Sequence, residues 1–203
     1  MSAVRLLRAG SGAWLVELPD NAHAARAVRR LRAAFGERLV EVVPGHRTVL
    51  AVGRVEPEEL RAAVETAPAD AGEEATGVHH AIVVVYDGPD LGEVAGLAGV
   101  SPEEVVRRHG ASVYTVAFLG FAPGFGYLIG GDPVLHVPRR DEPRERVPAG
   151  SVAVAGVYSG VYPRESPGGW RLLGRTGVTL FDPARNPPAL LAPSDTVRFE
   201  ARR

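Results

Sequence analysis

Residues 118–128, Phe-Leu-Gly-Phe-Ala-Pro-Gly-Phe-Gly-Tyr-Leu, are the most unusual stretch of the sequence, and the half of the chain around them is punctuated by glycine and proline. Short apolar, β-branched runs lie on both sides of this stretch. Many short strands separated by turn residues are typical of a barrel or a sandwich rather than a parallel α/β sheet. We expect strands at 82–86, 112–118, 136–137, 151–155, 170–173 and 196–200.

Two short helices are expected between the first two of these strands, at 91–97 and 102–109. Ser101 is a good N-cap for the second helix, and Glu104 at its third position completes a capping box. The C-terminal half is therefore expected to be mainly β with a small helical insertion.

The N-terminal half has a different pattern. Strands are expected at 4–7, 14–18, 39–43 and 48–52, and helices at 21–35 and 57–66. The first helix has apolar residues at three- and four-residue steps; Asp20 or Asn21 can cap it, and Gly36 can end it. The order ββαββα predicts a small α+β domain of a ferredoxin-like kind.

Residues 67–77 are rich in Ala, Pro, Gly, Asp and Glu and lack apolar periodicity, which is typical of a linker. We therefore expect a small α+β domain at 1–76 and a β-barrel domain at 77–203.

Composition excludes several classes of function. The 203 residues carry a formal net charge of −1, so no global field favours nucleic acid or an anionic membrane. The chain has no cysteine, which excludes thiolate catalysis and disulfides, and all 23 basic residues are Arg, which excludes a Schiff-base or Walker lysine. No apolar run reaches the roughly 20 residues that span a bilayer, and residues 1–16 contain no apolar h-region of the kind found in signal peptides. We expect a cytoplasmic protein.

Three segments are candidates for a site. In 118–128, Phe121, Phe125 and Tyr127 can wall a flat apolar pocket, because glycine lets the backbone approach a ligand and proline stiffens the loop. The alternative is an aromatic corner that only packs the barrel.

The second segment is 138–151, which is rich in Arg. Arg139 and Arg144 are the preferred anion holders, because the guanidinium fork binds carboxylate and phosphate bidentately. Interleaved acids make a solvated charged loop the alternative. Ala149, Gly150 and Ser151 offer backbone N–H groups that can form an anion nest.

The third segment is 156–176. Tyr162, Ser166 and Trp170 can shape one wall of a pocket, and Gly168 and Gly169 form a tight turn that exposes backbone donors. A barrel turn with a buried indole is the alternative.

His109 is the best acid/base candidate among the histidines, although a structural role at the end of its helix is an equal alternative. We predict no metal site. The sequence has no P-loop, no Gly-x-Ser-x-Gly elbow and no dinucleotide fingerprint.

Taken together, these segments resemble a known family. Residues 86–91 (Tyr-Asp-Gly-Pro-Asp-Leu), 118–128, 147–152 (Val-Pro-Ala-Gly-Ser-Val), 160–163 (Gly-Val-Tyr-Pro), 166–170 (Ser-Pro-Gly-Gly-Trp) and 174–176 (Gly-Arg-Thr) are similar, in that order, to motifs of the small subunit of bacterial 5-oxoprolinase, a family also called allophanate hydrolase subunit 1 or KipI-like. Two positions depart from its usual pattern: Gly126 replaces a frequent proline, and Tyr158 replaces a frequent glutamine.

The resemblance implies a C-terminal cyclophilin-like barrel and a subunit of an ATP-dependent 5-oxoprolinase. That complex opens the lactam of 5-oxo-L-proline to L-glutamate and includes a larger cyclophilin-like subunit and a third subunit. ATP with Mg would activate the amide carbonyl, and this chain is expected to be inactive alone. Two alternatives share the fold: half of a carboxyltransferase that acts on urea- or allophanate-type amides with a biotinylated partner, and a non-catalytic inhibitor of a histidine kinase.

Overall fold

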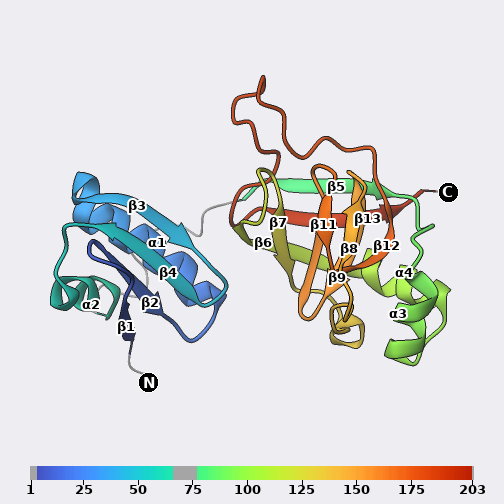
Figure 1. Ribbon diagram of the computed structural model, residues 1–203, viewed down its shortest axis with the longest axis horizontal. Helices are drawn as coiled ribbons and strands as arrows, with labels where there is room; N and C mark the ends of the chain where they lie inside the picture. Colours follow the sequence, from blue (N-terminus) through green and yellow to red (C-terminus); the bar gives the residue numbers. More distant parts are fainter. Residues whose placement is uncertain (1–3, 66–76, 203) are drawn as a thin grey trace. The chain divides into compact units, whose positions relative to one another are not determined.

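The computed structural model describes residues 4–65 and 77–202, which fall into two units, Met1–Thr76 and Gly77–Arg203 (Figure 1). Of the expected linker at 67–77, only Gly77 is described, and the expected last residue of the second helix, Thr66, also lies outside the described residues.

The first unit is a four-stranded antiparallel sheet in the order β1-β2-β4-β3, with α1 packed on β3 and β4 and in contact with α2 (Figure 1). Its elements follow the expected order ββαββα. That order differs from the βαββαβ order of the ferredoxin-like fold. The ferredoxin-like assignment of this unit is therefore not confirmed. The bounds are β1 Arg5–Arg8, β2 Ala13–Glu17, α1 Asn21–Phe35, β3 Leu39–Pro44, β4 Thr48–Gly53 and α2 Pro57–Glu65, with a 3-10 turn at Gly36–Arg38.

Helix α1 begins and ends where its capping residues dictate. The Asp20 carboxylate accepts a hydrogen bond from the His23 N–H at 2.8 Å. Gly36 ends the helix with a φ of 49°, which is costly for residues with a Cβ, and its N–H donates to the Arg32 carbonyl. Ala24, Ala27 and Leu31, three of the periodic apolar positions, are buried, whereas Val28 is half-buried, Ala34 is exposed, and Phe35 is buried at the end of the helix.

The second unit is built on a seven-stranded sheet in the order β12-β9-β10-β7-β6-β13-β5. Only the β13–β5 pair is parallel. The ends of the sheet meet where Val85 and Arg175 exchange two backbone hydrogen bonds of 2.9 Å each, so the sheet is a nearly closed barrel, consistent with a cyclophilin-like fold. The bounds are β5 His79–Val84, β6 Val113–Leu119, β7 Gly126–Ile129, β9 Ser151–Ala155, β10 Tyr158–Val161, β12 Arg171–Arg175 and β13 Thr196–Ala201.

Two helices, α3 Leu91–Ala98 and α4 Pro102–Ala111, lie together at one end of the barrel, and α4 packs on β13 (Figure 1). The Ser101 hydroxyl accepts from the Glu104 N–H, as the capping box predicts. The Glu104 carboxylate, however, pairs with Arg107 and Arg108 instead.

The sequence missed four short strands and placed one wrongly. Residues 136–137 are not a strand, because they follow a 3-10 turn (Pro133–Leu135) and the His136 and Val137 N–H groups bond back into that turn. The missed strands are rich in Gly, Pro or charge, which hides a period of two. They are β7, β10 and the small pair β8 Arg144–Val147 and β11 Ser166–Gly168, which form a separate two-stranded sheet.

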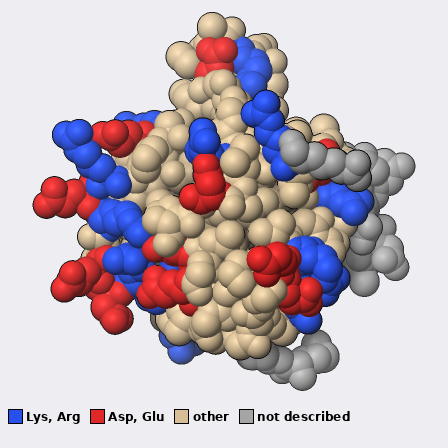
Figure 2. Space-filling view, turned by 90° about the vertical axis from the view of Figure 1, so that its right-hand side faces the viewer, with Lys and Arg blue, Asp and Glu red and all other residues tan. Residues whose placement is uncertain are grey.

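Acidic and basic side chains are interspersed on the face that Figure 2 shows, in keeping with the net charge of −1. Within the described parts of the chain, no helix is both long enough and apolar enough to cross a bilayer.

Candidate functional site

A pocket of about 460 Å³ opens in the barrel unit, and all three candidate segments contribute to it. The loop after β6 supplies aromatic rings, the segment before β8 supplies one arginine, and the ends of β9 to β12 supply the remaining wall. The lining residues are Phe121, Phe125, Tyr127, Pro138, Arg139, Ala155, Gly156, Tyr158, Tyr162, Gly168, Gly169 and Trp170.

Three rings form an aromatic box in this pocket. The rings of Tyr158 and Trp170 are nearly parallel, with an interplanar angle of 16° and centroids 6.2 Å apart. Tyr127 stands almost perpendicular to both, with its centroid 5.4 Å from Tyr158 and 5.6 Å from Trp170. Gly160 makes room for the indole, because a Cβ there would lie 3.1 Å from ring atoms of both Trp170 and Phe125. The box offers ring faces and edges to a flat ligand.

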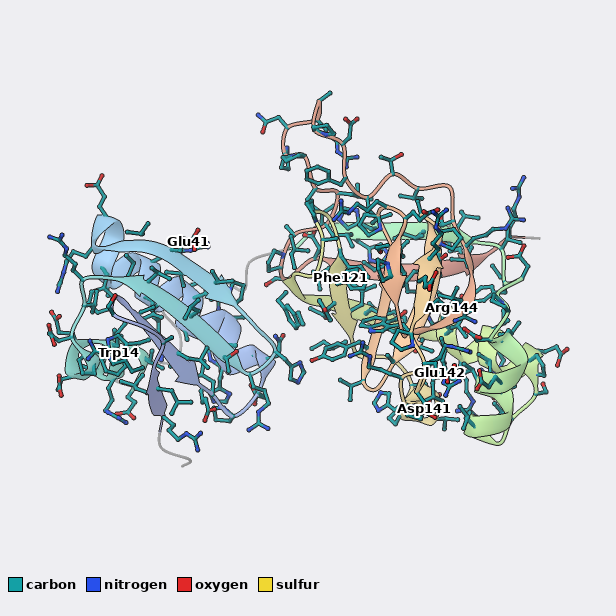
Figure 3. All side chains as sticks on the ribbon, viewed as in Figure 1. Trp14, Glu41, Phe121, Asp141, Glu142 and Arg144 are labelled. Atoms are coloured by element: carbon teal, nitrogen blue, oxygen red, sulfur yellow. The ribbon has the colours of Figure 1, made fainter. Side chains whose placement is uncertain are left out.

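Phe121 lies in a tight turn beside the box. Its φ is 65°, and the Ala122 N–H donates to the Gly120 carbonyl at 2.7 Å, which closes a three-residue turn around it. A positive φ is uncommon for a bulky residue and strains the backbone. The Phe121 side chain is nevertheless 56% exposed, whereas Phe125 is buried beneath it in edge-to-face contact. The turn therefore holds an apolar ring in solvent beside the pocket (Figure 3).

Arg139 is the one charged side chain among the described residues that line the pocket. Within residues 4–65 and 77–202 it forms no hydrogen bond or ion pair, and it is exposed. Burial raises the pKa of the Tyr127 and Tyr162 phenols, and the positive charge of Arg139 opposes this rise at both. The pocket thus combines neutral phenols with one unneutralised guanidinium, which suits a small anion that carries an apolar or amide-containing body.

Arg144 was expected to bind an anion, but its guanidinium is already paired within the fold. Its guanidinium donates to both carboxylate oxygens of Asp90, at 2.6 and 2.9 Å, and Arg140 also donates to Asp90 at 3.3 Å. Asp90 is only 2% exposed, so the pair is well shielded. Figure 3 labels Arg144 in the middle of the barrel unit. Of the two arginines that the sequence selected in this segment, Arg139 lines the pocket and Arg144 is paired within the fold.

The expected anion nest does not form at the pocket. The Gly150 N–H donates to the Tyr162 carbonyl at 2.7 Å and the Ser151 N–H to the Pro148 carbonyl at 3.3 Å, so both donors are already used. Ser151 begins a buried strand. The Ser166 hydroxyl donates to the Arg164 carbonyl at 3.4 Å. Ala149, Gly150, Ser151 and Ser166 are all absent from the lining of the pocket.

His109 lies in the barrel core instead of the pocket. Its exposure is 0%, and its ring stacks on Phe199 with centroids 4.4 Å apart. The Tyr86 hydroxyl lies 2.7 Å from Nδ1, and the Ser159 hydroxyl lies 2.9 Å from Nε2. Because Ser159 donates to the Ala153 carbonyl, its oxygen accepts from an Nε2–H group, and Tyr86 donates to Nδ1.

Burial lowers the pKa of His109 to about 3, so the ring is neutral near pH 7. A neutral, fully bonded and inaccessible imidazole cannot exchange protons with a ligand in this pocket. The acid/base role expected of His109 is therefore corrected, and the structural alternative describes its surroundings.

The lining also contains four residues that were not named as site candidates, Pro138, Ala155, Gly156 and Tyr158. Pro138, Gly156 and Tyr158 lie within the candidate segments 138–151 and 156–176, and Ala155 lies next to the latter. Among the described residues, no group of three or more His, Cys, Asp or Glu side chains is arranged to hold a metal ion.

Comparison with known proteins places the chain in a family. The family model "Carboxyltransferase domain, subdomain C and D" matches residues 4–191. A protein from Escherichia coli O157:H7 that is named as a 5-oxoprolinase subunit is 54% identical over 121 residues, which cover 58% of this chain and 56% of that protein. The chain spans roughly half the length of the curated relatives that it matches, and all three of them carry the same name.

Solved structures with a similar fold are also found. A conserved uncharacterized protein, PH0987 from Pyrococcus horikoshii, is 35% identical with a TM-score of 0.60, and the match covers 98% of this chain and 97% of that one. The urea carboxylase of Kluyveromyces lactis has a TM-score of 0.80 at 19% identity, covering 98% of this chain and 22% of that one, which shows a shared fold. The chain belongs to the carboxyltransferase domain family, subdomain C and D, and its resemblance to the small 5-oxoprolinase subunit is confirmed.

Proposed function

We propose that this chain is a subunit of an ATP-dependent 5-oxoprolinase and that its aromatic pocket binds 5-oxo-L-proline. The names of the three curated relatives support the activity. The observation that carries the assignment of the pocket is the unpaired Arg139 guanidinium beside the aromatic box. A small cyclic amide with one carboxylate matches both features.

The proposed ligand uses each part of the pocket differently. Arg139 binds the carboxylate, bidentately where the geometry allows. The rings of Tyr127, Tyr158 and Trp170 cover the small lactam ring and exclude water from it. Because the Tyr127 and Tyr158 phenols stay protonated near pH 7, their hydroxyl groups can donate hydrogen bonds to the lactam carbonyl.

The same pocket does not fit the triphosphate of ATP. A triphosphate carries about four negative charges, usually with Mg²⁺, and it is normally held by several cations or by a row of backbone N–H groups. Here one arginine is present, and the N–H groups of Gly150 and Ser151 are used within the fold. The proposed ATP site therefore lies on the partner subunits or at their interface with this chain.

The proposal includes partners and a location. The larger cyclophilin-like subunit and the third subunit complete the enzyme, and this chain alone is inactive. The complex works in the cytoplasm, where ATP is available. A lactam is resistant to hydrolysis, so coupling of ring opening to ATP is chemically reasonable.

The test is ATP-dependent release of L-glutamate from 5-oxo-L-proline by this chain co-expressed with its neighbouring subunits. Release should require this chain. Arg139→Gln should raise KM about 10- to 100-fold, because a charge-assisted hydrogen bond is worth about 1.5–3 kcal/mol. Arg146→Gln is the matched control, because that side chain is 81% exposed and its ion-pair partner Glu165 is 3.8 Å away.

A fully assembled complex that releases no glutamate would reject the substrate. An Arg139→Gln complex with an unchanged KM would reject the role of the pocket. Either result can be read only after size-exclusion chromatography has shown that the complex is assembled.

A second candidate is half of a carboxyltransferase that acts on urea-type amides, which the matching family model favours. That reaction uses a biotinylated partner, so avidin should abolish the activity of the assembled complex. Insensitivity to avidin, together with glutamate release, would reject this candidate.

A further inference from the structure

The backbone on both sides of Arg139 is tied to the strand region across the pocket. The Arg140 N–H donates to the Gly169 carbonyl at 2.8 Å. On the other side, the Arg171 guanidinium Nε donates to the Pro138 carbonyl at 2.9 Å. The exposed Arg139 therefore projects from a three-residue segment with two anchored neighbours.

Arg171 links this segment to helix α3. It begins strand β12, and it is only 7% exposed. While its Nε bonds Pro138, its Nη1 forms an ion pair with the carboxylate of Glu93 on α3. Because the guanidinium is planar and rigid, the contact with Glu93 sets the orientation in which Nε bonds the Pro138 carbonyl. A lysine at this position has the charge but cannot make both contacts from fixed directions.

Asp90 is a second anchor of the segment around Arg139. Its carboxylate accepts from the Leu172 N–H at 2.7 Å, next to Arg171 in β12, as well as from Arg140 and Arg144. It precedes α3 but makes no side-chain cap bond to that helix. Burial alone would raise the pKa of the Asp90 carboxyl, but the hydrogen bonds from Arg144 and Leu172 hold it below its usual range.

The neighbouring arginines therefore differ in whether they have an acidic partner. Arg140 and Arg144 both form ion pairs with Asp90, Arg171 forms one with Glu93, and Arg140 also lies 3.6 Å from Glu93. Arg139 alone faces the pocket without a counter-ion in the described part of the chain. We propose that Arg171, supported by Asp90 and Glu93, is a positioning residue that holds Arg139 ready for the substrate carboxylate. This inference rests on the proposed function.

The test is a double-mutant cycle in the co-expressed complex, with KM and kcat for 5-oxo-L-proline as readouts. Arg171→Lys should raise KM about 3- to 10-fold with little change in kcat, because a misplaced binding group loses affinity. In an Arg139→Gln background, the same change should alter KM by less than about twofold, because the two residues act as one unit. Arg146→Gln serves as the uncoupled control.

Glu93→Gln is the second variant, since Glu93 is 47% exposed and its change leaves no buried gap if Arg171→Lys fails to assemble. It should show the same coupling to Arg139, with a smaller rise in KM. Thermal unfolding of each variant is measured alongside the kinetics.

Equal effects of Arg171→Lys and Glu93→Gln on KM in the presence and absence of Arg139 would overturn the inference, as would an unchanged KM. An unchanged KM in Arg139→Gln itself would instead overturn the assignment of the pocket in the proposed function. The two failures are thus distinguishable within one experiment.

Discussion

The pocket and the cluster of Tyr86, His109, Ser159 and Phe199 are two aromatic regions of the same barrel that contain titratable groups. They differ in whether those groups have partners within the fold. Around His109, each ring nitrogen has a hydroxyl partner, and the ring is sealed by Phe199. Around Arg139, the rings of Tyr127, Tyr158 and Trp170 leave the guanidinium without a counter-ion among the described residues. One region has satisfied its polar groups within the fold, and the other retains a charge without a counter-ion among the described residues.

The difference shows that residue type alone is a poor guide to chemistry. Histidine is the commonest acid/base group in enzymes, yet desolvation lowers the pKa of this one to about 3. A buried polar cluster whose hydrogen bonds are complete stabilises a unique core. A charged group without a partner in a concave aromatic site is a better sign of binding.

The largest effect that would test this contrast is expected from His109→Ala. It removes a buried ring and leaves the Tyr86 and Ser159 hydroxyls without their shared partner, so the free energy of unfolding should fall by about 3–5 kcal/mol. Urea denaturation measures it. The exposed His136→Ala is the control and should change stability by less than about 0.5 kcal/mol. A loss below about 1 kcal/mol would show that His109 is not a core residue.

A smaller effect is expected on the pocket side of the comparison, from Gly168→Ala. An added Cβ would lie 2.3 Å from the Tyr162 hydroxyl oxygen, so the phenol must move. Such overpacking costs about 1–3 kcal/mol, and it should also raise KM, because Tyr162 lines the pocket. Gly177→Ala is the matched control, since nothing lies within 4 Å of its added Cβ. Equal KM values for the two variants would show that the position of Tyr162 does not affect substrate binding.

Sequence patterns predicted the helices and the longer strands well. Helix α1 runs from Asn21 to Phe35, as the apolar period and its caps predict, and β9 spans 151–155 as expected. Strands β7, β8, β10 and β11 were missed, since their Gly, Pro or charged residues obscure the alternation that identifies a strand. Local sequence carries local propensity, and these strands are fixed by pairing with distant partners.

The candidate site was predicted in part, for a related reason. Motifs selected Arg139, Tyr162 and Trp170, which do meet at the pocket. They also selected Arg144, whose partner Asp90 lies 54 residues away in sequence. Whether an arginine is free or paired depends on such long-range contacts, and one sequence does not display them.

A further expected effect is a pH dependence that belongs to the His109 side of the comparison. Its pKa is about 3 in the fold, against about 6.5 for an ordinary histidine, so the unfolded chain binds this proton first. Stability is therefore fully present above pH 6.5 and falls as the pH drops from 6.5 toward 3, by at most about 1.4 kcal/mol per pH unit.

His109→Gln isolates this contribution from the carboxylates, which also lose stability in acid. The groups that contact the imidazole, Tyr86, Ser159, Tyr114 and Phe199, do not titrate in this range, because burial raises the pKa of both phenols. Urea denaturation at pH 7.5 and 5 should show the wild-type advantage over His109→Gln shrinking at the lower pH. A difference that stays constant would mean that His109 is not held neutral by burial, and the contrast with the open pocket would then lose its physical basis.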